Sequence, residues 1–141
     1  YGGTPSDASV IEAIRRLRAR GRHVTFYPFI LMEQLAGNGR PDPWSDAEDQ
    51  PVLPWRGRIT LAKARGQAGS PDGTGAAAAQ VADFFGTAQP GDFAADAAGR
   101  VTYAGPGDFR YRRFILHYAT LCAAAGGVDA FCIGSEMVAL T

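Results

Sequence analysis

The sequence has little cysteine, no excess of charge and no long apolar run. Two cysteines, Cys122 and Cys132, are too few for a disulfide framework or a zinc site. Both lie among apolar residues, so we expect buried free thiols. Lys and Arg together number 14, as do Asp and Glu. This balance argues against nucleic acid or an anionic membrane as the main partner. No apolar run reaches the roughly 18 residues of a membrane span.

The composition is that of one globular domain with long loops. The chain has 141 residues, of which 46% are hydrophobic, with 18 glycines and 9 prolines. This much glycine and proline predicts long irregular segments around a modest core. The sequence starts at Tyr1 without a visible secretion signal, and we expect it to be a piece of a longer protein.

Apolar spacing and end signals predict three helices and one short hairpin. Thr4 and Asp108 are the expected N-caps of the first and third helices. Gly21, Gly86 and Gly126 follow the last helical turns, where glycine commonly ends a helix. The expected helical ranges are 4–20, 70–85 and 108–125, and residues 100–103 are expected to form one arm of the hairpin.

Two segments, 23–32 and 128–133, are rich in β-branched and aromatic residues. Apolar residues on both faces predict buried strands of a parallel sheet. Helix 108–125 would be the crossover between them in a βαβ unit. Pro28 marks either a bulge or the end of regular pairing. Residues 33–107 would then form an oversized insertion on the side that carries the ligand site in α/β proteins.

Glu136 is the main catalytic candidate from position alone. It follows the strand at 128–133, where partial desolvation at the rim of a sheet raises a carboxyl pKa, as a general acid requires. The alternative is that Glu136 opens the next helix and only complements its dipole. Glu33 holds the matching place after the first strand, as a second acidic group or as an exposed loop residue. His23 and His117 form no triad.

The long loop contains the two tryptophans, Trp44 and Trp55, and Arg56 follows the second. Exposed indole faces pack against the C–H faces of sugar rings, and a nearby arginine supplies hydrogen-bond donors. The alternative is that both tryptophans only anchor the loop.

Several stretches together resemble a known family. They are YGGTPSDAS at 1–9, VTFYPF at 24–29, PWRGRI at 54–59, YRRFILHY at 111–118 and GVDAF through IGSE at 127–136. This combination resembles the TIM-barrel-like domain of gene transfer agent and phage tail proteins, found in the large tail-tip or baseplate hub protein. The resemblance spans essentially the whole chain.

The resemblance implies an α/β fold, a partial (β/α)8 barrel similar to retaining glycoside hydrolases. Residues 1–141 would be its middle segment, about strands two to four, with 33–107 as a long βα insertion. Glu136 would take the acid/base role. Ser135 stands where many members of that clan have an asparagine that contacts the sugar 2-hydroxyl. Trp55 and Arg56 match a segment near the substrate cleft.

A full barrel takes about 250 residues, so the nucleophile of the seventh strand would lie outside this chain. The implied function is cleavage of a cell-envelope glycan during particle entry, with no metal and no organic cofactor. Trp44, Trp55, Arg56, Glu33 and Ser135 are the expected substrate-binding residues.

The expected partners are the remainder of the parent barrel, other tail or baseplate subunits and an envelope polysaccharide. The expected location is the tail of a phage-like particle that is made in the bacterial cytoplasm. One alternative is an inactive barrel that serves as a structural or glycan-binding part of the tail. Another is a free-standing small α/β domain.

Overall fold

A computed structural model describes residues 3–96 and 98–140 of the chain. These residues divide into two compact units. The first, which we call the sheet unit, lies within residues 1–28 and 85–133. The second, the loop unit, lies within residues 29–84 and 134–141. Each unit is built from segments far apart in the sequence.

The sheet unit contains a parallel strand pair, as the sequence predicted. Strands β1 (Thr25–Phe26) and β4 (Ala130–Phe131) are paired in parallel, with Thr25 opposite Ala130 and Phe26 opposite Phe131. The Phe26 carbonyl also accepts a hydrogen bond of 2.9 Å from the Cys132 N–H. In the described part of the chain no barrel is formed.

The predicted strand lengths were wrong. The segments 23–32 and 128–133 each contribute only two paired residues. Pro28 has no N–H to donate, and the chain passes into the loop unit directly after it. Thr25 and Ala130 are exposed, so burial on both faces is not found among the described residues.

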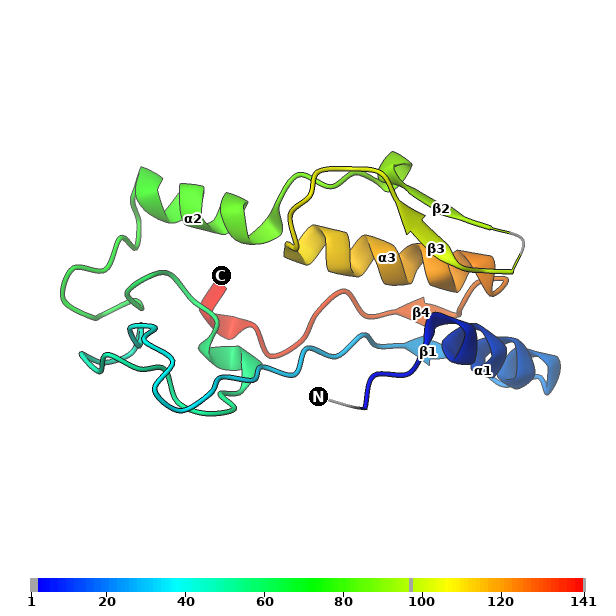
Figure 1. Ribbon diagram of the computed structural model, residues 1–141, viewed down its shortest axis with the longest axis horizontal. Coiled ribbons are helices and arrows are strands. Elements are labelled where there is room, and N and C mark those ends of the chain that lie inside the picture. Colours follow the sequence, from blue (N-terminus) through cyan, green and yellow to red (C-terminus); the bar gives the residue numbers. More distant parts are fainter. Residues whose placement is uncertain (1–2, 97, 141) are drawn as a thin grey trace. The chain divides into compact units, whose positions relative to one another are not determined.

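Helices α1 (Asp7–Ala19) and α3 (Tyr111–Ala124) lie beside the strand pair (Figure 1). Arg15 of α1 donates from Nη2 to the Ala124 carbonyl of α3 at 2.8 Å. Apolar side chains from both helices and from the segments that flank the strands meet in one core. Its buried members are Ile11, Ile14, Val24, Leu121, Cys122 and Ala125.

The predicted N-caps were wrong, whereas the predicted glycine ends are confirmed. Ser6, not Thr4, caps α1, and its Oγ accepts the Ser9 N–H at 3.2 Å. Arg110, not Asp108, is the N-cap residue of α3, because its backbone is still extended, with φ −108° and ψ 168°. Gly21 has a φ of 66°, and it follows α1 in the left-handed conformation that glycine adopts without strain.

An antiparallel hairpin packs on α3. Strands β2 (Phe93–Ala95) and β3 (Val101–Tyr103) pair with Phe93 opposite Tyr103, and these two rings lie 4.7 Å apart. The hairpin arm predicted at 100–103 is therefore confirmed. It belongs to the sheet unit, so the stretch 33–107 that the sequence analysis treated as one insertion is divided at residue 84.

The loop unit has little regular structure. It contains nearly all of helix α2 (Gly75–Phe85) and two 3₁₀ turns, Arg56–Arg58 and Val138–Leu140. Helix α2 begins later than the predicted start at 70–72, because the Thr74 hydroxyl accepts the Ala77 N–H at 3.4 Å. The turn Arg56–Arg58 places Arg56 beside Glu136 and Arg58 beside Asp42.

Both cysteines are free thiols, and Cys122 is buried while Cys132 is half-buried. Burial raises the pKa of the Cys122 thiol to about 11, so it remains protonated at neutral pH. Among the described residues, no helix has both the length and the apolar character to cross a bilayer.

Candidate functional site

The guanidinium of Arg56 organises one end of the loop unit. Its residue is only 8% exposed, which is rare for a cation. Nη2 lies 2.9 Å from Glu136 Oε2 and donates to Ser135 Oγ at 3.2 Å. Nε donates to the Ser135 carbonyl at 3.2 Å, and the group lies 4.0 Å from the centre of the Phe29 ring. These contacts fix the guanidinium plane from several directions.

Glu136 combines a constrained backbone with an open side chain. Its φ is 56°, a left-handed conformation that costs a non-glycine residue about 1–3 kcal/mol and that is frequent at functional sites. The side chain is 56% exposed, so the partial burial expected from the sequence is not found. The 3₁₀ turn begins two residues later, at Val138, so Glu136 does not open a regular helix.

The turn around Arg56 also sets the position of Trp55. A Cβ on Gly57 would lie 2.0 Å from two atoms of the Trp55 ring, which shows that the indole folds directly over this glycine. Trp55 is still 56% exposed. The ring is therefore supported on one side by backbone and open elsewhere to solvent, as a stacking surface requires.

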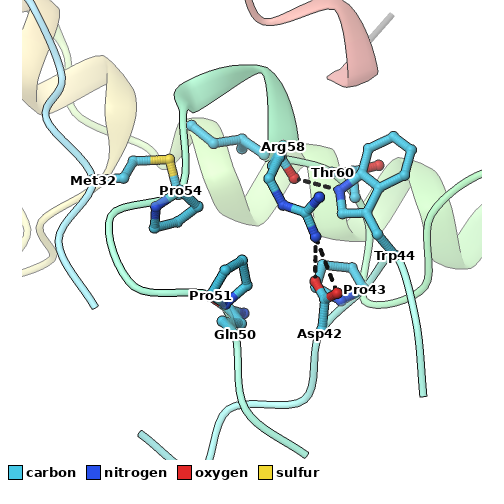
Figure 2. Close-up of a pocket in the computed structure, with 10 residues that line it drawn as sticks. Met32, Asp42, Pro43, Trp44, Gln50, Pro51, Pro54, Arg58 and Thr60 are labelled. Carbon is cyan, nitrogen blue, oxygen red and sulfur yellow. Dashed lines mark hydrogen bonds and ion pairs between the residues drawn. The ribbon is translucent and has the colours of Figure 1, made fainter. Parts of the chain in front are cut away.

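Trp44 lies in a different part of the loop unit, beside the Asp42–Arg58 pair. Its indole N–H donates to the Arg58 carbonyl at 2.9 Å, and Arg58 Nη2 contacts both oxygens of Asp42, at 2.8 and 3.0 Å (Figure 2). Burial acts to raise the pKa of Asp42, but hydrogen bonds from Ser45 and Arg58 outweigh it and hold that pKa below its usual value. Asp42 is therefore ionised at neutral pH.

The structure brings together three of the residues singled out from the sequence, Arg56, Ser135 and Glu136. Glu33 is exposed in the loop unit, and Trp44 lines the Asp42 wall instead. Sequence reasoning missed Phe29, which it placed in a strand, and the pair Asp42 and Arg58. The sequence signal that could have indicated the second pair is the spacing of Arg56 and Arg58 on either side of Gly57. In the 3₁₀ turn these two arginines contact different carboxylates, Glu136 and Asp42.

The two histidines have structural partners. His117 Nε2 lies 3.1 Å from Asp7 Oδ1 and links α3 to α1. His23 Nδ1 lies 3.5 Å from Asp129 Oδ1. Within the described ranges, no group of three or more His, Cys, Asp or Glu side chains is arranged to hold a metal ion.

The similarity to a known family lies in the C-terminal part of the chain. Residues 109–141 match the family model of the GTA TIM-barrel-like domain. This match confirms the predicted resemblance for residues 109–141, whereas the resemblance was expected over essentially the whole chain. The matched segment contains α3, β4 and the Ser135-Glu136 pair, whereas Trp55 and Arg56 lie outside the segment of the GTA TIM-barrel-like match. No curated protein and no solved structure matches the chain significantly.

Proposed function

We propose that this chain is the middle segment of a glycoside hydrolase-like barrel in a gene transfer agent particle, and that the barrel cleaves a cell-envelope glycan during entry. In this proposal residues 1–141 supply about strands two to four, and a carboxylate elsewhere in the barrel is the nucleophile. The particle tail or baseplate would be its location. The remainder of the barrel, neighbouring tail subunits and the envelope polysaccharide would be its partners.

The observation that carries the proposal is the pairing of an exposed carboxylate with a buried cation. The 2.9 Å contact between Glu136 and Arg56 orients the Glu136 side chain, while more than half of it stays accessible to a substrate. Glu136 would protonate the glycosidic oxygen as it leaves and then deprotonate the incoming water. Its left-handed backbone fits the strain that functional residues often carry.

The contacts of Arg56 support a different role from the sugar binding expected of it. The sequence suggested a sugar ligand, but the guanidinium is buried against Ser135, Glu136 and Phe29. We propose that Arg56 is a positioning residue for the Glu136 carboxylate. Trp55 remains the candidate for sugar stacking, and Ser135 would contribute through its bond to Arg56.

The test is hydrolysis of purified peptidoglycan and envelope polysaccharide by the full-length protein, followed as release of reducing ends. Glu136→Gln keeps the shape of the side chain but removes the proton that catalysis needs. We expect the rate to fall at least about 100-fold, the usual contribution of acid/base catalysis. Glu48→Gln, an exposed residue of the same unit, is the matched control and should leave the rate unchanged. Equal rates for wild type and Glu136→Gln would remove Glu136 from the mechanism.

A second candidate function is glycan binding without cleavage. The specific observation in its favour is the indole of Trp55, which is supported by Gly57 and needs no carboxylate chemistry to hold a sugar. This function predicts retention of the polysaccharide by the wild type and by Glu136→Gln alike, with no reducing ends released by either.

A further inference from the structure

A small cavity in the loop unit lies beside the Asp42–Arg58 pair. Its volume is about 170 Å³. Figure 2 shows Trp44, Pro51, Pro54 and Met32 around it, with Asp42 and Arg58 forming a polar wall. Pockets for drug-sized ligands enclose about 300–1,000 Å³, so this cavity suits a ligand of one ring.

The polar wall is preorganised. The Asp42 side chain is 9% exposed, and both of its oxygens accept from Arg58 Nη2, while the Ser45 hydroxyl donates to Oδ2 at 2.8 Å. A buried ion pair of this kind gives little net stability, because desolvation of the two charges offsets their attraction. What the pair provides is a guanidinium held in one orientation.

The fixed guanidinium keeps hydrogen-bonding capacity for a ligand. Its side chain is 30% exposed, and both of its bonds to Asp42 leave from Nη2. Nε and Nη1 carry three further N–H donors. Among the residues that the structure describes, none accepts a hydrogen bond from them.

Charge decides which kind of ligand suits the cavity. Of the described residues in its wall, Asp42 and Arg58 alone carry charge, and their charges cancel. An anionic ligand would therefore meet no net attraction. A neutral ligand with several hydroxyl groups and one apolar face matches both walls, because Trp44 and the proline rings offer apolar surface and Arg58 offers donors.

We propose that this cavity is a binding site for a single neutral pyranose, separate from Glu136. The site would take one sugar unit of a glycan, with the C–H face of the ring against Trp44 and the prolines and its hydroxyl groups toward Arg58. Only the identity of the natural ligand, a unit of an envelope glycan, rests on the proposed function. Binding of a free monosaccharide requires no hydrolysis.

The test uses the two tryptophans of the sequence. Trp55→Phe leaves Trp44 as the single indole of residues 1–141. In the full-length protein, the emission change that is lost when Trp44 is also replaced by Phe reports the cavity. We expect saturable changes with N-acetylglucosamine or glucose at a Kd on the order of 1 mM, corresponding to about −4 kcal/mol. Glucuronate should bind no more tightly than glucose.

Two variants made in the Trp55→Phe protein test whether the sugar binds in this cavity. Arg58→Lys keeps a cation beside Asp42 but removes the spare donors, and it should weaken sugar binding at least about tenfold. Met32→Phe places a larger side chain in the cavity and leaves both members of the ion pair unchanged, so it should abolish sugar binding. This variant tests the site independently if Arg58→Lys does not fold. Arg40→Lys, an exposed arginine of the same unit, is the matched control and should bind like the parent.

The outcomes are distinct from those of the hydrolysis test. Sugar binding by a wild-type protein that releases no reducing ends supports the cavity while the proposed hydrolysis fails, and this binding should survive Glu136→Gln. No saturation by either neutral sugar at 100-fold the expected Kd would overturn the site. Tighter binding of glucuronate than of glucose, or sugar binding unaffected by Met32→Phe, would overturn it as well.

Discussion

Arg56 and Arg58 have similar sequence contexts but different partners in the structure. The two arginines are separated by one glycine, yet one is paired with Glu136 and the other with Asp42. The sequence identified Trp55, Arg56, Ser135 and Glu136 as residues of interest. It could not show that Arg56 faces Ser135, because the two are 79 residues apart and nothing local encodes that contact.

Gly57 offers a sharp test of the Trp55 surface. In Gly57→Ala the new Cβ would overlap the indole, which lies 2.0 Å from its position, so the ring must move away. We expect polysaccharide affinity to fall about tenfold, equivalent to about 1.4 kcal/mol, together with a change in tryptophan emission. Binding to immobilised glycan and fluorescence spectra measure the two effects.

Gly75→Ala is the control for that substitution. Apart from its chain neighbours and the backbone of its own helix, no atom of the described residues lies within 4 Å of a Cβ at Gly75, so the same chemical change should leave affinity and emission as they are. If Gly57→Ala binds the glycan as tightly as the wild type, Trp55 is not the stacking surface.

At the scale of elements, helices were predicted better than strands. The three helices were identified because apolar spacing, glycine ends and helical contacts are all local in sequence. The strands shrank to two residues each, because strand pairing depends on neighbours that the local pattern does not contain. The N-cap errors have a simpler cause, since Thr4 and Ser6 are both good caps and only the backbone dihedrals at Ser6 decide between them.

The cap of α1 has a measurable effect on stability. Ser6→Ala removes the acceptor for the Ser9 N–H and leaves the first turn with one more unpaired donor. We expect a loss of about 1 kcal/mol in the free energy of unfolding, because α1 places Ile11 and Ile14 in the core. Chemical denaturation followed by circular dichroism measures it. Thr4→Ala, two residues earlier, should unfold at the wild-type denaturant concentration; an equal loss there would mean that Thr4 contributes to the cap.

At the scale of the whole chain, the candidate site and the paired strands belong to different units. Glu136 comes five residues after β4 in sequence, but its partner Arg56, and the Phe29 ring that Arg56 contacts, are both in the loop unit. A strand-end residue is normally positioned by its sheet. Here Arg56, from the 3₁₀ turn of the loop unit, contacts the carboxylate instead.

The sheet unit should lose stability in acid through Asp129. The Val24 N–H donates to Asp129 Oδ2 at 2.7 Å, and this bond, with charges from His23 and Arg18, lowers the pKa of Asp129 against a smaller opposing effect of desolvation. A carboxyl whose pKa is lower in the folded state stabilises it fully above the ordinary value of about 3.9. That contribution disappears as the pH falls through the lowered folded-state pKa.

Asp129→Asn isolates this effect, since the amide cannot titrate. Its melting temperature should lie below that of the wild type at pH 7, and the two should converge toward pH 3 as Asp129 becomes protonated. Glu48→Gln should instead follow the wild-type curve throughout. A constant gap between wild type and Asp129→Asn from pH 7 to pH 3 would mean that the ionised carboxylate contributes nothing beyond a neutral acceptor at the start of the parallel pair.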